Sequence, residues 1–204
     1  MNSKLYKYFI EKRAHHNLRL DFSQNLAAEY SALGLSPVER MTRRFELLCQ
    51  AEKPQMQPFE KIVLMRTVKK QPDIFTEAEW ADIKAKHYIH ELGFVSNLSL
   101  DYGRVIGSGL LAVRENADAY GRRVIDAIID LCDRYKRLAV EQDRRDVVEV
   151  LSRVPRYGAT NFREALQMFR ILHYALWLEG DYHNTVGRFD QYIYPYFKRD
   201  MDAG

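Results

Sequence analysis

The chain is a succession of helical hydrophobic patterns separated by glycine, proline and capping residues. The clearest start is Ser36-Pro37-Val38-Glu39, in which a serine can cap free amides, a proline suits the first turn and a glutamate can complete a capping box. Thr76 and Glu79 repeat this arrangement. The pattern therefore predicts one helix that runs from residue 36 to about residue 53 and another from residue 76 to about residue 91.

Most of the remaining chain also has helical spacing. One stripe is formed by Val124, Ile128, Leu131, Tyr135 and Leu138, which recur at helical intervals. Glycines at 103, 107 and 109 weaken the helical pattern just before it. We expect further helices over residues 4–33 (one or two), 59–70, 102–116, 117–142, 143–153 and 161–179, and a loop over residues 93–100. The predicted fold class is mainly α, with few or no strands.

The predicted helix over residues 161–179 is apolar on nearly every face. Thr160 is placed to cap it, and its apolar residues include Phe162, Met168 and Ile171. A helix that is apolar all round needs neighbours on every side. We therefore expect part of its surface to meet polypeptide outside these 204 residues.

The composition is that of an ordinary globular protein, with 47% hydrophobic and 29% charged residues. The formal net charge of +3 comes from interspersed charges, which argues against a nucleic-acid partner. We see no apolar run long enough to cross a membrane and no export signal, so we expect a cytoplasmic protein. Cys49 and Cys132 lie in amphipathic patterns and are predicted to be buried free thiols.

No catalytic or metal-binding group is identified from the residues alone. His87, His90 and Glu91 could share one helix face, but their order matches no common zinc motif and no third ligand is indicated. Neither cysteine has the electropositive, exposed setting of a nucleophile. We therefore predict no metal site and no catalytic residue in this chain.

Four sequence blocks carry a resemblance to a known family. The most specific is Gly187-Arg188-Phe189-Asp190-Gln191-Tyr192-Ile193-Tyr194-Pro195-Tyr196, which resembles the GRFDQYxYPY segment of the glycyl radical enzymes, the family of pyruvate formate-lyase and of the glycerol, diol and hydroxyproline dehydratases. The other blocks are Glu60-Lys61-Ile62-Val63 with Arg66-Thr67, Asp101-Tyr102 with Arg104-Val105-Ile106 and Gly109-Leu110, and Asn161-Phe162-Arg163-Glu164-Ala165-Leu166-Gln167. The resemblance is stronger over residues 58–204 and weak over residues 1–57, and we treat residues 1–204 as a single helical region.

The resemblance implies that this chain is an amino-terminal fragment of a radical enzyme built around an α/β barrel. In that family a glycyl radical generates a thiyl radical on a cysteine, which attacks a small polar substrate. Neither the cysteine motif nor the glycyl loop is present here; residues 102–109 share only Arg104, Val105 and Gly107 with the loop pattern, which we take as chance. The radical is expected on the missing carboxyl-terminal part, so the fragment would hold no cofactor and be inactive alone.

The implied partners are the remainder of the polypeptide, a radical S-adenosylmethionine activating enzyme and a second copy in a homodimer. The bond cleaved could be C–C, C–O, C–N or C–S. The alternative is a self-contained helical interaction or regulatory module, which the capped helices alone would fit equally well.

The resemblance also implies substrate-binding residues. Thr185 takes the place of a serine that contacts substrate in many relatives, and Asp101 begins the Asp-Tyr pair. Several dehydratases carry Gly-His a few residues ahead of the Asp-Tyr pair; this chain has Gly93-Phe94 there, and Asn97 further on is the implied substrate-binding residue. Arg188 and Asp190 are expected to frame the pocket through charge-assisted hydrogen bonds.

Overall fold

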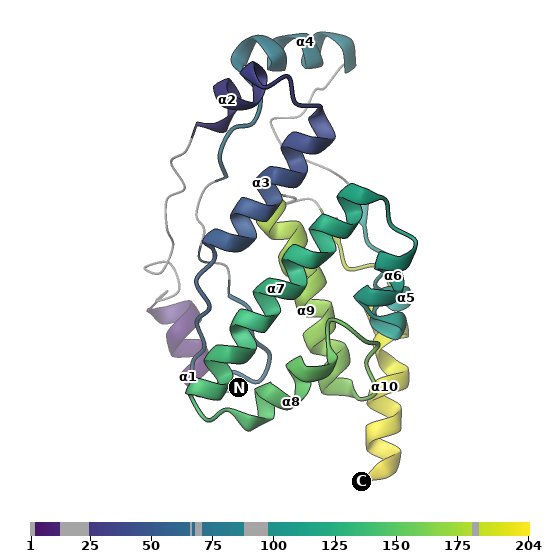
Figure 1. Ribbon diagram of the computed structural model, residues 1–204. Coiled ribbons are helices and arrows are strands. Elements are labelled where there is room, and N and C mark those ends of the chain that lie inside the picture. Colours follow the sequence, from purple (N-terminus) through teal and green to yellow (C-terminus); the bar gives the residue numbers. More distant parts are fainter. Residues whose placement is uncertain (1–2, 13–24, 66, 68–70, 88–97, 181–183) are drawn as a thin grey trace.

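The computed structural model describes residues 3–12, 25–65, 67, 71–87, 98–180 and 184–204, and this part of the chain is mainly α (Figure 1). Among these residues the strands form a single two-stranded pair. In order, the elements are α1 (Ser3–Tyr6), a π-helix η1 (Lys7–Glu11), α2 (Leu26–Ala32), α3 (Pro37–Ala51), α4 (Glu77–His87), β1 (Leu98–Ser99), α5 (Tyr102–Ser108), α6 (Leu110–Glu115), α7 (Ala119–Glu141), α8 (Arg145–Arg153), α9 (Phe162–Glu179), β2 (Asn184–Thr185) and α10 (Phe189–Ala203).

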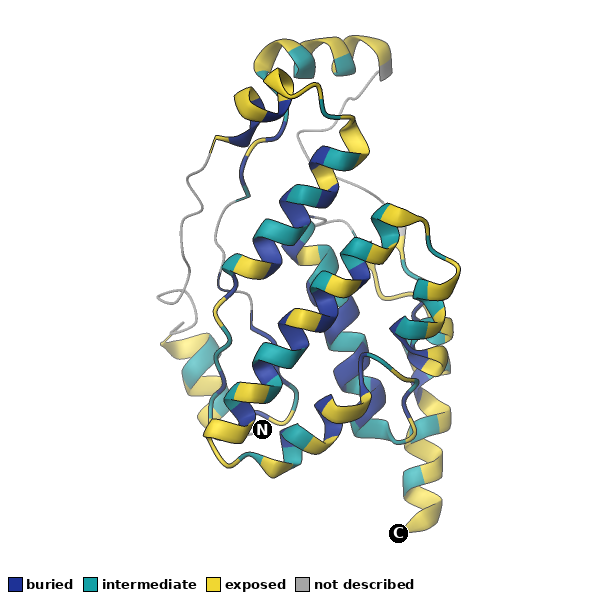
Figure 2. Ribbon diagram, viewed as in Figure 1, coloured by how far each residue is buried: buried dark blue, intermediate teal, exposed yellow. Residues whose placement is uncertain are grey.

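Three long helices form the centre of the molecule. α7 packs along α3. α9 lies behind α7 in the view of Figure 1 and also contacts α3. Leu48 of α3, Leu131 of α7 and Ile171 of α9 are fully buried between them. Figure 2 shows that the faces these helices turn toward one another are buried and that the opposite face of α7 is exposed. Burial of apolar area between the helices is thus the main stabilising term of the fold.

The apolar stripe predicted on α7 faces this core. Ile128, Leu131 and Tyr135 are buried, and Val124 and Leu138 are partly buried and packed against the cluster. The helical periodicity of the sequence therefore correctly predicted which face of α7 is buried.

Local capping chemistry decides where several helices begin. The Ser36 hydroxyl accepts a hydrogen bond from the Glu39 amide (3.3 Å) at the start of α3. Thr76 and Glu79 form the predicted reciprocal box, because each backbone amide bonds to the other side chain (2.8 and 3.3 Å). At α9 the expected cap was wrong: Asn161, not Thr160, accepts from the Glu164 amide (2.9 Å).

The helix predicted over residues 59–70 is absent from the residues described there, 59–65 and 67. Lys61 to Met65 instead run without regular secondary structure against α7 and α9, and we call this segment the strap. Gln167 bonds to both the N–H and the C=O of Val63, and the Tyr135 hydroxyl does the same for Met65. Side chains of the packed helices thus satisfy backbone groups that a helix would have satisfied within itself.

The predicted helix over residues 102–116 is divided into α5 and α6 at Gly109. Gly109 has φ of +80°, and a Cβ at this position would lie 2.5 Å from the carbonyl oxygen of Arg156. At this break the Leu110 amide donates to the carbonyl of Pro155 (2.8 Å). This hydrogen bond holds the start of α6 against the turn at residues 153–159. The glycine is required by this close backbone approach.

The strap, α3, α5, α8 and α10 cover more of α9 than its sequence suggested. Trp177 is the one large apolar residue of α9 classed as exposed in the described structure, at 39%. The uncovered apolar surface predicted for this helix is therefore narrow. Beside it, the partly buried Leu176 and the buried Leu172 line an open groove toward α7.

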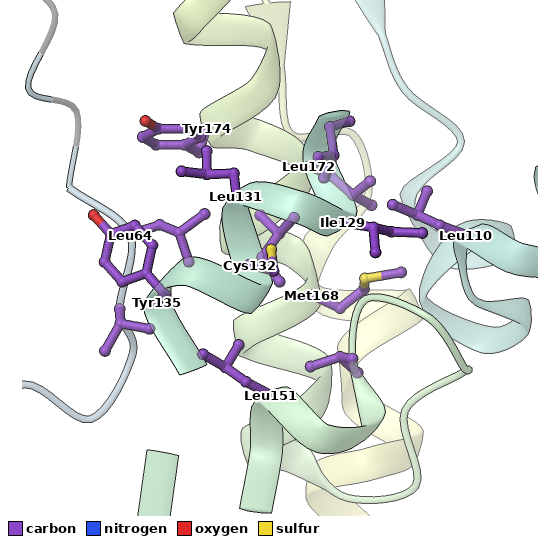
Figure 3. Packing of buried hydrophobic residues seen from close by; sticks show 14 of the residues in the cluster. Leu64, Leu110, Ile129, Leu131, Cys132, Tyr135, Leu151, Met168, Leu172 and Tyr174 are labelled. Atoms are coloured by element: carbon purple, nitrogen blue, oxygen red, sulfur yellow. The ribbon is translucent and has the colours of Figure 1, made fainter. Parts of the chain in front are cut away.

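Both cysteines are buried, as predicted. Cys132 of α7 and Met168 of α9 both belong to the buried hydrophobic cluster (Figure 3). Burial raises the pKa of both thiols far above the ordinary value, so they remain protonated. Within the described residues, none of the helices combines the length and apolarity needed to traverse a bilayer.

Candidate functional site

Two segments that are more than eighty residues apart meet in the strand pair. β1 and β2 are parallel, with Leu98 opposite Asn184 and Ser99 opposite Thr185. The expected loop over residues 93–100 therefore ends in a strand, which two isolated residues could not have revealed. Because parallel strands end on the same side, the residues that follow each strand also come together. These are Leu100 after β1 and Val186 after β2, and Asp101 and Arg188 come shortly after them in the chain.

Four of the five predicted site residues lie at or just after this strand pair. Thr185 is the last residue of β2 and is exposed. Asp101 is the N-cap of α5, where its carboxylate accepts from the Arg104 amide (3.3 Å). Arg188 and Asp190 form a bidentate pair (3.3 and 3.1 Å) at the start of α10. Asn97, the fifth residue, lies outside the described residues.

The Arg188–Asp190 pair changes the pKa of its carboxyl group. The hydrogen bond from Arg188 holds the pKa of the Asp190 carboxyl below its usual value, so this carboxylate is ionised at neutral pH. Both side chains are about two-thirds exposed, and an exposed pair contributes little to stability. The pair can therefore shape the turn between β2 and α10 and also remain accessible to a ligand.

An aromatic cluster supports the strand pair from inside. Tyr102 is buried and stacks on Tyr192 of α10, with ring centroids 5.9 Å apart. The Tyr192 hydroxyl donates to the carbonyl of Val186 (2.7 Å), directly after β2. Tyr102 also forms a hydrogen bond with Nδ1 of His173 in α9 (3.1 Å). Residues from α5, α9 and α10 thus fix the position of the β2–α10 turn.

The protonation states in this cluster follow from burial. Burial raises the pKa of Tyr102 to about 12, and desolvation with the nearby Arg170 charge lowers the pKa of His173. At neutral pH the pair therefore consists of a neutral phenol and a neutral imidazole. It can hold one hydrogen bond without a buried charge.

Sequence reasoning missed His173, Tyr192 and Ser99 as part of this site. A lone histidine in a helix rich in apolar residues was the available signal for His173. Ser99 carried no signal, because its importance depends on its pairing with Thr185. No group of three or more potential metal ligands occurs in the described part of the chain; His90, Glu91 and the side chain of His87 lie outside that part.

The sequence pattern of the Pyruvate formate lyase-like family matches residues 36–204. The chain belongs to this family. The match begins at the Ser36 cap of α3 and includes both strands of the candidate site. The glycyl radical resemblance read from the sequence is thereby confirmed.

A curated relative with detectable similarity is the 4-hydroxyphenylacetate decarboxylase glycyl radical subunit of Clostridioides difficile. It is 32% identical over 68 residues, which make up 33% of this chain and 8% of the relative. The aligned segment is thus only a small part of either protein.

Three solved structures resemble most or nearly all of the fold. An enzyme of 1,2-propanediol dehydration in Roseburia inulinivorans matches with a TM-score of 0.72 at 20% identity, covering 99% of this chain and 35% of its own. The B12-independent glycerol dehydratase of Clostridium butyricum gives 0.63 at 17% identity, covering 83% of this chain and 33% of its own. Hydroxyproline dehydratase of Clostridioides difficile gives 0.61 at 14% identity, covering 99% and 34%. This member of the Pyruvate formate lyase-like family therefore spans about a third of the length of these solved relatives.

Proposed function

We propose that this chain is the amino-terminal part of a glycyl radical enzyme that cleaves a C–C, C–O, C–N or C–S bond in a small polar metabolite, and that it is inactive alone. The family match over residues 36–204 carries this proposal. The parallel pairing of residues 98–99 with 184–185 is consistent with it, because the pairing sets Thr185 beside the strand that leads to Asp101. In this arrangement the helices supply one wall of a substrate pocket.

Three residues are assigned to the substrate. The hydroxyl of Thr185 can donate one hydrogen bond and accept two, and it is exposed at the end of β2. Asp101 caps α5 two residues after the neighbouring strand, and Asn97 directly precedes that strand in the sequence. Arg188 and Asp190 frame the pocket through their mutual ion pair.

The chemistry itself is assigned to polypeptide beyond this chain. The glycyl radical and the cysteine that abstracts hydrogen would be supplied there, after activation by a radical S-adenosylmethionine enzyme. The complete protein is proposed to be a cytoplasmic homodimer. The residues of this chain then bind and orient the substrate and exclude water from the reactive centre.

Uncovered apolar surface supports a larger protein. A groove of about 540 Å³ lies between α3, α5, α7 and α9 and is lined by residues such as Met41, Val124 and Leu172. On α10, Tyr194, Phe197 and Met201 are exposed at 57%, 41% and 65% and follow helical spacing (Figure 2). Exposed apolar surface of this kind is typical of a face that meets other polypeptide.

Two experiments test this proposal: the nucleotide sequence downstream of Gly204 and detection of a glycyl radical in the complete protein. The reading frame beyond Gly204 should encode a cysteine motif and a terminal R-V-x-G-Y segment. The complete protein, treated anaerobically with its activating enzyme and S-adenosylmethionine, should then show the electron paramagnetic resonance doublet of a glycyl radical. The matched control replaces the glycine of that terminal segment by alanine and should give no signal. A stop codon directly after Gly204, with a monodisperse protein that binds no hydrophobic dye, would instead support the self-contained module.

A further inference from the structure

A second pocket lies between the amino-terminal helices and the strap. It has a volume of about 390 Å³, and none of its described lining residues belongs to the strand pair. Pockets that hold small organic molecules measure roughly 300–1,000 Å³, so its size suits such a ligand. Most of its described lining residues are apolar: Leu5, Phe9, Phe59, Ile62, Leu64 and Met65.

Tyr8 holds the amino-terminal wall of this pocket in place. Its ring packs edge-to-face on Phe59, with centroids 5.9 Å apart, and its hydroxyl accepts a hydrogen bond from Gln57 Nε2 (3.4 Å). Phe9, the next residue of η1, packs against Tyr8 with centroids 4.9 Å apart and lines the pocket. These contacts position Phe9 as an apolar wall of the pocket.

Two cations and one carboxyl group also line the pocket: Arg170, Lys61 and Glu60. Arg170 of α9 donates through Nε and Nη2 to the carbonyl of Leu64 (2.9 and 2.6 Å). Its Nη1 donates to no described residue and is not enclosed by protein, so solvent reaches this atom. Because a guanidinium stays protonated in proteins, Arg170 has a charged donor available to a ligand.

The charges around the pocket favour an anion. Lys61 is exposed, and its Nζ lies 3.6 Å from the Asp146 carboxylate. That carboxylate already accepts hydrogen bonds from Arg144 and Arg163, so it does not cancel the charge of Lys61. Positive charge is therefore in excess on this side of the pocket.

Glu60 opposes this excess only partly. Its side chain is buried, and Oε2 accepts a hydrogen bond from the Gln57 amide (2.6 Å). Burial raises the pKa of the Glu60 carboxyl, which favours its neutral form, although the charges of Arg170 and Arg144 act in the opposite direction. With Lys61 and Arg170 both cationic, the pocket has a net positive charge in either form of Glu60.

We propose that this pocket binds a small monocarboxylate that has an apolar body. The carboxylate lies between Arg170 and Lys61, where charge-assisted hydrogen bonds offset its desolvation. The apolar body packs on Leu5, Phe9 and Ile62, which removes its surface from water. Binding at this pocket requires no radical chemistry.

The test uses hexanoate and hexan-1-ol, which have the same chain length and differ in charge. Their dissociation constants are measured by ligand-observed NMR titration of the full-length protein before activation. Wild type should bind hexanoate about fivefold more tightly than hexan-1-ol. Arg170→Gln keeps an amide donor for the Leu64 carbonyl, and it should weaken hexanoate binding about tenfold while hexan-1-ol binding is unchanged.

Three further variants locate the ligand. Lys61→Met, at an exposed position, should weaken hexanoate binding about threefold, and it decides the question if Arg170→Gln does not fold. Phe9→Ala should weaken both probes together, because it removes an apolar wall. Lys86→Met is the matched control, since Lys86 is also exposed and paired with an aspartate but lies on α4, and it should bind both probes as wild type does.

The inference is overturned if wild type binds hexanoate no more tightly than hexan-1-ol, or if neither Lys61→Met nor Arg170→Gln weakens hexanoate binding. Tighter binding of hexylammonium than of hexanoate would also overturn it, because Glu60 would then select the ligand. Loss of hexanoate binding in Thr185→Val would place the ligand at the strand pair instead. Formation of the glycyl radical tests the proposed function separately.

Discussion

Gln167 supplies both hydrogen bonds that the backbone of Val63 requires. The Val63 amide donates to Gln167 Oε1 (2.8 Å), and Gln167 Nε2 donates to the Val63 carbonyl (3.1 Å). Both residues are about 1% exposed. A side chain of α9 thus does for the strap what a neighbouring strand does in a sheet.

Removal of this side-chain amide should be costly. In Gln167→Leu the buried N–H and C=O of Val63 lose their partners, and each unsatisfied buried group costs on the order of 1–3 kcal/mol. We expect the free energy of unfolding to fall by about 2–5 kcal/mol in urea denaturation. Gln50→Leu, at an exposed position of α3, is the control and should change it by less than about 0.5 kcal/mol. A loss in Gln167→Leu no larger than that of the control would contradict the prediction.

The strap also shows why one predicted helix was wrong. Ile62, Val63, Leu64 and Met65 form an apolar run that suits a short helix as well as a buried extended segment. What decides between them is Gln167, about a hundred residues away, together with Tyr135 on α7. Interactions of this kind, between residues far apart in the sequence, cannot be recognised from the local pattern of apolar and polar residues.

Two glycines of α5 should respond oppositely to alanine. At Gly103 a Cβ would lie 3.0 Å from Cβ of Tyr192, which is anchored by stacking on Tyr102 and cannot easily move. At Gly107 the nearest atom would be Tyr196 Oη at 3.8 Å, an ordinary contact. Gly107→Ala should therefore stabilise the protein by roughly 0.5–1 kcal/mol. Gly103→Ala should destabilise it by about 1–3 kcal/mol through overpacking.

Thermal unfolding of the two variants provides the measurement. The midpoint should rise for Gly107→Ala and fall for Gly103→Ala, relative to wild type. Equal shifts of the same sign would mean that the Tyr192 contact does not limit space at Gly103.

The candidate site was predictable only in part, and the reason is again the range of the interactions. Helix caps such as Ser36 with Glu39 involve residues three apart, so the sequence alone identifies them. Thr185 and Asp101 came from family resemblance, and their arrangement depends on a pairing between residues 98–99 and 184–185. A strand of two residues is too short to show the alternation of apolar and polar residues from which strands are predicted.

The Glu79–Arg40 pair should make stability depend on pH in the acid range. Arg40 donates to both carboxylate oxygens (2.9 Å each), and these bonds, followed by hydrogen bonds from Thr76, lower the pKa of Glu79 from 4.5 to about 2. Because the folded-state pKa is depressed, the stabilisation is complete above about pH 4.5 and is lost as the pH falls toward 2. The difference in melting temperature between wild type and Glu79→Gln should therefore be largest near neutral pH and shrink across this interval.

Asp82→Asn serves as the control on the same helix. Asp82 pairs with the exposed Lys86, and such a pair contributes little at any pH. Its melting profile should follow that of wild type. A Glu79→Gln difference that stays constant from pH 7 to 2 would show that the ion pair is not the source of the dependence.

The two thiols should be unreactive until the protein unfolds. Cys49 and Cys132 are 2% and 1% exposed, and burial raises the pKa of each, so little thiolate is present at neutral pH. An aromatic disulfide reagent should label neither thiol in the native protein within minutes and should label both in denaturant. Cys49→Ser and Cys132→Ser, each with one thiol left, assign the signals. Rapid labelling of the native chain would mean that one of these cysteines is accessible as a nucleophile, contrary to the packing of α3 and α7 around them.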